Sequence, residues 1–176
     1  MRILVLMLCC IFSAVTAHAA LQQICRTDTI PASTPDSSLI DHGNGTVTDS
    51  KTGLMWKKCL EGAEGTDCEI GSPSNFTWQG ALQQPGTVNA SGGFAGYQDW
   101  RLPNIRELYS LVEEQCYSPA INLNRFPNTP QELTVWSGSP CVTDLDSAWS
   151  VFLGYGYSKA NNRNLSSAVR LVRGGQ

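Results

Sequence analysis

The sequence predicts an α+β domain with two short helices and a small, mainly antiparallel sheet. Three observations lead to this prediction: two short apolar segments joined by a Gly-containing turn at 46–56, two capped helical segments starting near residues 77 and 104, and alternating segments in the C-terminal third. The chain has 176 residues, and chains of roughly 100–200 residues usually form one domain.

Composition places the chain among ordinary globular proteins. Hydrophobic residues make up 41% of the sequence, and the glycines and prolines follow no triplet period, which excludes a collagen-like or disordered chain. The net charge is −3. Because nucleic-acid-binding domains are usually strongly basic, we expect no nucleic-acid partner.

Residues 1–19 have the pattern of a secretory signal peptide. Arg2 supplies the positive charge, residues 3–15 form an apolar segment too short to span a bilayer, and Ala17-His18-Ala19 fits a cleavage motif. We therefore expect an exported protein that is periplasmic, on the cell surface or secreted, with no membrane insertion of the mature chain.

The mature chain then contains five cysteines: Cys25, Cys59, Cys68, Cys116 and Cys141. In an oxidising compartment disulfides are the default, and five cysteines allow two bridges with one thiol left over. Cys59 and Cys68 enclose a Gly-rich, acidic loop that can double back easily, so we pair them. The pattern alone does not choose a pair among the other three.

The N-terminal part predicts an arm followed by a hairpin. Residues 20–40 are polar and rich in Pro and Ser, which predicts an extended arm leading into a domain at 41–176. Thr46–Asp49 alternates, and Leu54–Trp56 is apolar and aromatic. With a Gly-containing turn between them, these two segments predict the strands of a hairpin.

Two helices are expected in the middle of the chain. The first is predicted at 76–84, with Thr77 as its N-cap and an apolar spacing formed by Trp78, Ala81 and Leu82. The Gly/Ser/Asn-rich stretch at 86–96 predicts a loop. The second helix is predicted at 105–112, because Asn104 and Glu107 have the spacing of a capping box.

Three strands are expected in the C-terminal third, after a long Pro- and Asn-rich loop that ends at residue 130. They are predicted at 134–137, 148–152 and 168–173. Trp56, Trp100 and Trp136 are expected to fill the core. We expect Asp99 and Arg101, which flank Trp100, to satisfy buried backbone groups.

Metal-binding and catalytic patterns are weak. Cys and His residues do not have zinc spacing. Calcium prefers oxygen ligands, but no calcium-loop motif occurs among the aspartates Asp49, Asp99, Asp144 and Asp146. We expect no metal and no cofactor, with a structural calcium ion as the alternative left open. His42 is the one histidine beyond the signal peptide, which argues against a Ser-His-Asp or Cys-His site, so we expect no catalytic residues and no enzyme.

The C-terminal charge pattern indicates a ligand surface. No acidic residue follows Asp146, whereas four basic residues do: Lys159, Arg163, Arg170 and Arg173. Aromatic residues among Asn, Ser and basic groups are typical of adaptable recognition surfaces. Arg170 and Arg173 are equally compatible with ion pairs to earlier carboxylates. We expect Lys159 and Arg163 to be exposed in a loop.

Several strings together resemble a known family. They are Gly45-Thr46-Val47-Thr48-Asp49, Thr52-Gly53-Leu54-Met55-Trp56, Asp99-Trp100-Arg101-Leu102-Pro103-Asn104, Val135-Trp136-Ser137 and Val169-Arg170-Leu171-Val172-Arg173. The chain from about residue 41 to 175 resembles the Lcl C-terminal domain family, found in exported bacterial proteins that include collagen-like adhesins. The resemblance implies a C-type-lectin-like fold, related to the formylglycine-generating enzyme, with a variable ligand surface near the C-terminus.

The resemblance also implies a site. Some proteins of this fold are diversified by retroelements at C-terminal surface positions, which here implies the ligand-binding set Cys141, Asp144, Ser147, Ser150, Phe152, Tyr155, Tyr157, Lys159, Asn161, Asn162, Arg163, Asn164, Ser166 and Ser167. With Cys141 in that variable stretch, the second bridge is Cys25–Cys116. We further expect one exposed face to contain Tyr155, Tyr157, Lys159, Asn161, Asn162 and Arg163 together with Asp144 and Ser150.

The resulting functional hypothesis is a non-enzymatic, adhesin-like recognition domain for a surface protein or an anionic glycan. One alternative is a relative of the formylglycine-generating oxidase. That enzyme uses a reactive cysteine pair near its C-terminal end, where this chain offers only Cys141. The other alternative is a structural component of the envelope or of an appendage.

Overall fold

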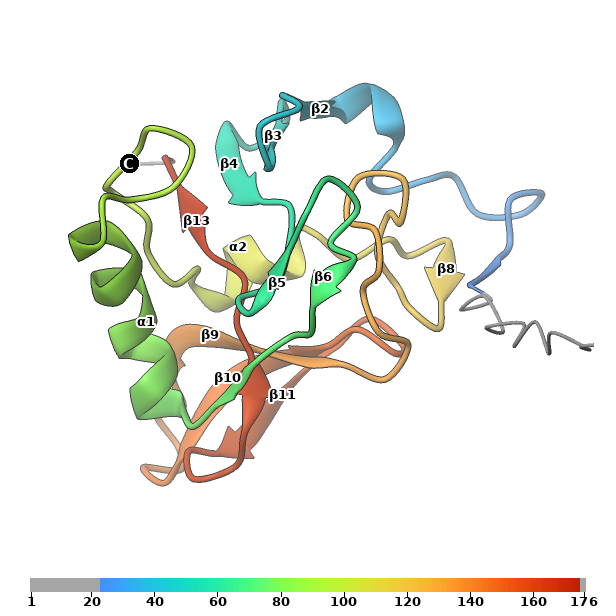
Figure 1. Cartoon of the computed structure of the whole chain (residues 1–176). Coiled ribbons are helices and arrows are strands. Elements are labelled where there is room, and N and C mark those ends of the chain that lie inside the picture. Colours follow the sequence, from blue (N-terminus) through green and yellow to red (C-terminus); the bar gives the residue numbers. More distant parts are fainter. Residues whose placement is uncertain (1–22, 175–176) are drawn as a thin grey trace, which may run out of the picture.

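Two sheets stand at opposite ends of the molecule, with α1 along one side and α2 between them (Figure 1). The structure of the chain, a computed structural model, describes residues 23–174, so the predicted signal peptide at 1–19 lies outside the described residues. Two helices and mostly antiparallel strands confirm the predicted α+β class.

The four-stranded sheet has the order β13-β4-β3-β2. Its centre is the predicted hairpin, in which Val47 lies opposite Trp56. Both residues are fully buried, so the alternation in the sequence does point one face of this hairpin into the core. The strands are β2 (Leu39–Asp41), β3 (Thr46–Asp49), β4 (Leu54–Lys57) and β13 (Val172–Arg173).

The five-stranded sheet has the order β11-β10-β9-β12-β7. All its pairings are antiparallel except that of β12 with β9, which is parallel. Its strands are β7 (Asn75–Phe76), β9 (Thr134–Pro140), β10 (Ser147–Phe152), β11 (Tyr157–Asn162) and β12 (Ser167–Ala168). Strands β9 and β10 confirm the predictions at 134–137 and 148–152, whereas β11 was expected to be a loop.

The predicted strand at 168–173 is two strands instead of one. β12 ends at Ala168 in the five-stranded sheet, and β13 begins at Val172 in the other sheet. Figure 1 shows this red segment passing from one sheet to the other. Along the crossing, the carbonyls of Val169 and Leu171 accept hydrogen bonds from the N–H groups of Glu61 and Lys57, at 2.9 and 3.0 Å.

Helix α1 (Trp78–Ala90) begins as predicted, because the Thr77 side chain accepts a hydrogen bond from the Gly80 N–H. It continues through Pro85 to Ala90, so the predicted loop at 86–96 is wrong over its first five residues. The last turn is held by tertiary contacts: the Asn89 side chain bonds both the N–H and the carbonyl of Trp100. Leu82, expected on the apolar face, is 44% exposed.

Helix α2 (Ile105–Tyr109) has the predicted capping box. The Asn104 side chain accepts from the N–H groups of Arg106 and Glu107, and the Glu107 carboxylate accepts from the Asn104 N–H. The helix ends at Tyr109, three residues earlier than predicted. Leu108 is buried in it, and Leu111 and Val112 remain buried in the turn that follows.

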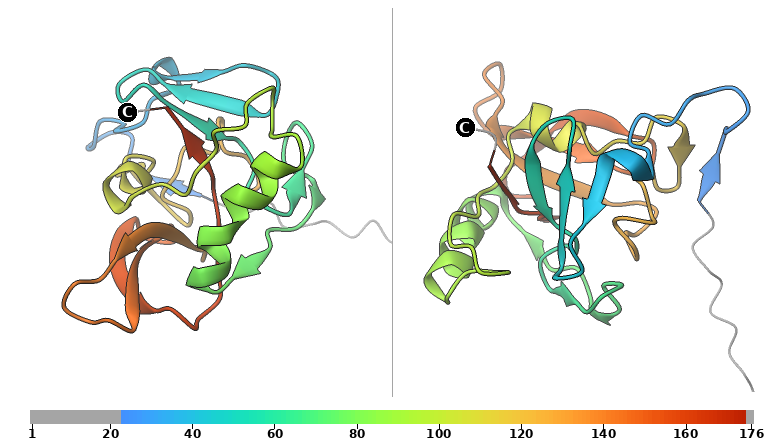
Figure 2. Two further views of the ribbon diagram at one scale, coloured as in Figure 1. Left: turned by 90° about the vertical axis from the view of Figure 1, so that its left-hand side faces the viewer. Right: turned by 90° about the horizontal axis from the view of Figure 1, so that it is seen from above.

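The core has two main parts, one on each face of β9 and β10. Val135 and Val151 belong to the part beneath α2, whereas Trp136 and Ala148 belong to the part beneath α1. Trp56, Trp100 and Trp136 are each at most 2% exposed, which confirms their predicted role. The left view of Figure 2 shows the two sheets and both helices around this core.

The N-terminal arm is fastened at two points. Cys25 in β1 (Ile24–Cys25) forms a disulfide with Cys116 in β8 (Cys116–Tyr117), as predicted. Farther along, the buried carboxylate of Glu113 accepts hydrogen bonds from the N–H and hydroxyl groups of both Ser33 and Thr34. Beyond these bonds the arm leads through a short 3-10 helix (Asp36–Ser38) into β2.

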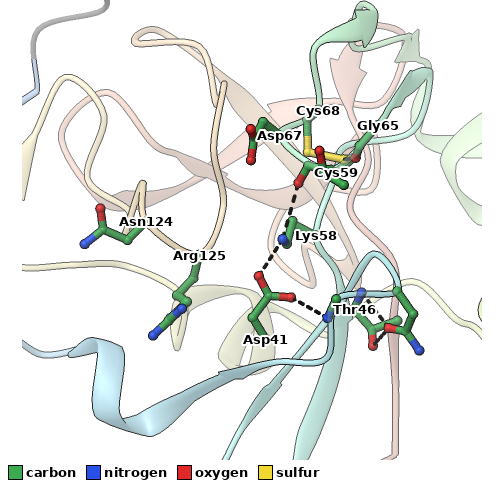
Figure 3. A network of polar contacts seen from close by, with 12 residues as sticks. Asp41, Thr46, Lys58, Cys59, Gly65, Asp67, Cys68, Asn124 and Arg125 are labelled. Atoms are coloured by element: carbon green, nitrogen blue, oxygen red, sulfur yellow. Dashed lines mark hydrogen bonds and ion pairs between the residues drawn. A yellow bond between two sulfur atoms is a disulfide. The ribbon is translucent and has the colours of Figure 1, made fainter.

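The Cys59–Cys68 disulfide is also as predicted, and it closes the loop that contains β5 (Ala63–Glu64) and β6 (Ile70–Gly71). Figure 3 shows Lys58 between this loop and Asp41. Its ammonium group lies 2.5 Å from the Asp41 carboxylate and 3.3 Å from the carbonyl of Thr66. Lys58 therefore joins the closed loop to the four-stranded sheet.

Arg170 lies in the crossing segment and is 1% exposed. Its guanidinium donates to the carbonyls of Lys57 and Lys58 and to the hydroxyl of Thr129, and it stacks on Phe126 at 4.7 Å. Burial lowers the pKa of Arg170 to about 9, so the group still carries its charge at neutral pH. Its burial argues against the ligand-binding alternative, and among residues 23–174 it forms no ion pair with a carboxylate.

Between residues 23 and 174, no helix combines the length and the apolar character needed to cross a bilayer.

We predict that Arg170→Met lowers the free energy of unfolding by about 3 kcal/mol, because it leaves two buried carbonyls without donors. Arg173→Met is the matched control. Arg173 is partly buried and pairs with the exposed Asp99 at 2.7 Å. Such solvent-accessible ion pairs contribute about 1 kcal/mol or less. Urea denaturation of both variants checks this, and equal losses would show that the buried contacts of Arg170 contribute no more than the ion pair of Arg173.

A second prediction concerns acid stability. Burial raises the pKa of Glu113, but hydrogen bonds from Ser33, Thr34 and Gln115 outweigh it and hold the pKa below its usual value. A depressed carboxylate pKa stabilises the fold above the unfolded-state pKa of about 4.3, and this stabilisation is lost as the pH falls through the folded-state value. In Glu113→Gln the free energy of unfolding should therefore fall less steeply as the pH drops below about 4.3. The test is the difference between the urea midpoints at pH 3 and pH 7, measured for the variant and for the unchanged chain. If the two proteins show the same difference, this role of Glu113 is contradicted.

Candidate functional site

The candidate site is built on the hairpin of β10 and β11. These strands are paired at six successive positions, from Ser147 opposite Asn162 to Phe152 opposite Tyr157. The predicted loop around Lys159 is wrong, because Lys159 lies opposite Ser150 in this ladder. The four-residue turn ends at Gly156, which has a φ of +71°. A Cβ atom there would lie 2.7 Å from Val112, so close packing against Val112 fixes the tip of the hairpin.

Four aromatic side chains cluster at this tip. Phe152 lies 6.0 Å from Tyr155 and 5.4 Å from Tyr157, and Tyr155 stacks on Tyr117 of β8 at 6.1 Å. Tyr155 is 63% exposed and Tyr157 is 45% exposed. The Lys159 ammonium lies 5.1 Å from the centre of the Phe152 ring. The four rings therefore form an exposed aromatic surface with a cation at its edge. We call these four residues the aromatic tip: Tyr117, Phe152, Tyr155 and Tyr157.

A pocket of about 400 Å³ adjoins Lys159 on the same face of β11. Seven of its lining residues are polar or charged: Asn75, Glu132, Thr134, Lys159, Asn161, Ser166 and Ser167. Leu133 and Leu165 complete the lining. The pocket combines amide, hydroxyl, carboxylate and ammonium groups, which suits a polar ligand with several hydrogen-bonding groups.

Four residues of the predicted set are buried: Cys141, Ser147, Ser150 and Ser167. Ser150 is fully inaccessible, its hydroxyl donating to the carbonyl of Lys159 and accepting from the Asn161 side chain, both at 3.1 Å. The expectation that Ser150 belongs to an exposed face is therefore wrong. Its hydroxyl instead joins β10 to β11.

The other predicted residues lie at the opposite end of the hairpin. Arg163 stacks on Trp78 of α1 at 4.4 Å and donates to the carbonyl of Ser147 at 3.1 Å. With Asn164, it lines a second pocket, of about 510 Å³, beside the start of α1. Asp144 is exposed in the loop between β9 and β10 and accepts from the Ser147 hydroxyl at 2.7 Å.

The predicted single face is thus divided. Successive side chains of a strand point to opposite faces, so Tyr157, Lys159 and Asn161 share one face of β11 while Asn162 lies on the other. Arg163 and Asp144 belong to neither group, because they follow or precede the paired strands. The structure brings together the aromatic tip, Lys159 and Asn161, and it separates the rest.

Four residues of the site were not predicted from the sequence: Tyr117, Glu132, Thr134 and Asn75. Tyr117 follows Cys116 directly, and the disulfide to Cys25 fixes the position of β8. No local pattern places β8 beside the tip of a hairpin 35 residues later. Glu132 and Thr134 lie at the entrance to β9, and that position becomes informative only once the strand order is known.

Two ion pairs outside this site involve the residues on either side of Trp100 in the sequence. Asp99 pairs with Arg173, and Glu107 binds Arg101 through two hydrogen bonds of 2.8 and 2.7 Å. The Arg101 guanidinium lowers the pKa of Glu107, and that of Arg173 lowers the pKa of Asp99. Asp99 and Arg101 thus form ion pairs. They were predicted to satisfy buried backbone groups, and Arg101 does donate to a backbone carbonyl, that of Gly174 at 2.9 Å, but this group is exposed.

The remaining free cysteine in the described range is Cys141, and its buried sulfur lies 3.4 Å from the Thr143 hydroxyl. That hydrogen bond lowers the pKa of the Cys141 thiol. Over residues 23–174, no three His, Cys, Asp or Glu side chains are grouped closely enough to hold a metal ion.

The sequence of most of the chain matches that of a known protein family. Residues 45–173 match the family described as the Lcl C-terminal domain. The matched region begins just before β3 and ends in β13, so it contains the five-stranded sheet, the four-stranded sheet except β2, both helices and the whole candidate site. No curated protein matches the chain.

The division of the predicted set into buried and exposed residues can be tested by stability measurements. Ser150→Ala removes a buried hydrogen-bonding group and should lower the free energy of unfolding by about 1–2 kcal/mol. Asn164→Ala changes an exposed side chain and should stay within about 0.5 kcal/mol. Urea unfolding of both variants gives the comparison, and a cost at Asn164 as large as that at Ser150 would contradict the assignment.

Proposed function

Because the chain belongs to the Lcl C-terminal domain family, we propose that it is an exported, adhesin-like recognition domain with a C-type-lectin-like fold. The two disulfides support export, since such bonds persist in oxidising compartments. The ligand surface is the aromatic tip together with Lys159, Asn161 and the adjoining polar pocket.

The observation that carries this proposal is the exposure of the aromatic tip. Large aromatic side chains are usually buried, and those left on a surface commonly anchor a partner. Tyr155 and Tyr157 project from a hairpin whose position is fixed by β10, Gly156 and the Ser150 hydroxyl. A rigid hairpin that presents tyrosines, asparagines and serines has the chemistry of an adaptable binding surface.

The partner is a surface protein or an anionic glycan. Lys159 makes no ion pair among residues 23–174 and is available to an anionic group, and the serine and asparagine side chains of the pocket suit hydroxyl or amide ligands. Exposed positions of β11 can change without breaking the ladder, because its hydrogen bonds come from the backbone. The hairpin is therefore also suited to diversification by a retroelement.

The oxidase alternative needs a second thiol near Cys141. The other four cysteines that the structure describes form the two disulfides. No observation favours that reaction over recognition, and no catalytic role is proposed. The alternative of a structural envelope component is an outcome of the binding test.

We expect the mature chain, from residue 20 onward, to bind components of an array of surface glycans and surface proteins. The triple variant Tyr155→Ser, Tyr157→Ser, Lys159→Ser should weaken that binding at least about tenfold, because aromatic anchors dominate interface energies. If the bound component is an anionic glycan, raising the salt concentration should also weaken it.

The control is the triple variant Ile30→Ser, Ile70→Ser, Arg26→Ser, which removes two exposed apolar side chains and one cation elsewhere. It should bind like the unchanged chain. Circular dichroism and thermal unfolding verify that both variants are folded. Binding that survives in the hairpin variant would place the site elsewhere, and a complete absence of binding would favour the structural role.

A further inference from the structure

Strand β11 forms one edge of the five-stranded sheet, and among residues 23–174 no strand pairs with its outer side. In β10, the odd-numbered residues bond toward β9: the Leu153 N–H donates to Leu133, and the Ser147 carbonyl accepts from Cys141. The even-numbered residues of β10 therefore bond toward β11. Consistently, the Arg163 N–H donates to the carbonyl of Asp146 at 2.8 Å.

This alternation determines which groups of β11 are free. Tyr157, Lys159 and Asn161 direct their backbone groups to β10, so the N–H groups of Ser158, Ala160 and Asn162 point outward. All three residues are exposed, and these N–H groups have no acceptor among residues 23–174. An exposed strand edge of this kind is a template for another strand.

A groove runs beside this edge on the face opposite the aromatic tip. It has a volume of about 400 Å³ and lies between α2 and the β10–β11 hairpin, lined by Ile105, Arg106, Tyr109, Trp149 and Ser158. The left view of Figure 2 shows α2 over this face of the sheet. Trp149 lies opposite Ala160, whose small side chain leaves the indole uncovered on that side. The groove is therefore mainly apolar.

The edge and the groove fit one ligand. A residue that hydrogen-bonds to an edge strand places its side chain on the same face as the residue opposite it. Side chains opposite Ser158 and Ala160 would thus lie over the groove, where Tyr109 and Trp149 can contact them. Arg106 is exposed, forms no ion pair within the described part of the chain, and no acidic residue lines the groove.

We propose that β11 accepts an extended peptide segment of a partner protein as an added sixth strand, with a large apolar side chain in the groove and a carboxylate on Arg106. This inference rests on the proposed recognition function and specifies a protein partner and a binding mode for it. Backbone hydrogen bonds to β11 supply affinity, and the groove and Arg106 supply selectivity.

A second copy of the chain fits this edge less well. In a symmetric β11–β11 pair, the partner would place its own Ser158, Ala160 and Asn162 side chains over the groove. These side chains are small or polar and leave Tyr109 and Trp149 largely uncovered. The apolar groove and the unpaired Arg106 therefore favour a different sequence, with alternating large apolar residues and an acidic group.

The test uses random-peptide phage display on the mature chain from residue 20, followed by titration of the enriched synthetic peptides into the ¹⁵N-labelled chain. We expect peptides that alternate large apolar residues and contain Asp, Glu or a free C-terminus. Binding should slow the hydrogen exchange of the Ser158, Ala160 and Asn162 amides. Peptides that bind without protecting these amides, or the enrichment of none, would overturn the proposal.

Two matched pairs of variants complete the test. Ala160→Pro removes an outward N–H group, which an edge strand tolerates, and should weaken the peptide about tenfold or more, whereas Ala160→Ser keeps the group and should stay within about twofold. Arg106→Glu should weaken acidic peptides about tenfold, and Arg26→Glu, with the same change in net charge, should not. Equal affinity of Ala160→Pro and the unchanged chain would refute the added strand.

Three results separate the possible failures. If the free chain already protects these amides and sediments as a dimer, the edge is an interface between copies and the proposal fails. Ala160 and Arg106 lie outside the surface altered in the array experiment. Failure of the peptide test with array binding intact therefore refutes the added strand alone. If the peptides bind as expected but the hairpin variant retains full array binding, the aromatic tip alone is refuted as the ligand surface.

Discussion

The buried guanidinium of Arg170 connects the segment that crosses between the two sheets with the end of β4 and with the loop that precedes β9. It takes its acceptors from the end of β4 and from the loop that precedes β9, while its own backbone lies between the two sheets. Placing a cation in the core requires acceptors with fixed positions, because an unsatisfied buried charge is very costly. The contact therefore specifies the separation of the sheets and the path of the C-terminal segment as well as contributing stability.

Local signals in the sequence predicted most of the individual elements. The capping box at Asn104 and Glu107 and the hairpin at 46–57 depend on residues close together in the chain, and their structures agree with the prediction. Two errors came from tertiary contacts that override local preference. Helix α1 continues beyond Pro85 because Asn89 is bound to Trp100, and the C-terminal strand divides because it serves two sheets.

The candidate site was predicted in the correct segment but with the wrong conformation. Residues 157–162 contain Ser, Lys and two Asn, which strands usually disfavour, and they form β11 because β10 provides a complete ladder for them. Successive side chains of a strand point to opposite faces, so Lys159 and Asn162 are separated. The pairing of β11 with β10 also buries the Ser150 hydroxyl between the two strands. The pattern of residue types indicated recognition chemistry, but only the register assigns each side chain to a face.

The crossing of the C-terminal segment also has a consequence for the order of folding. β12 lies between β9 and β7, and β13 is the edge strand beside β4, so the segment at 167–173 supplies a strand to each sheet although it follows all their other strands in the chain. Neither sheet can be completed before this segment has been synthesised. The closure of both sheets therefore depends on contacts between residues far apart in the sequence, and topologies of that kind fold more slowly than those built from local contacts.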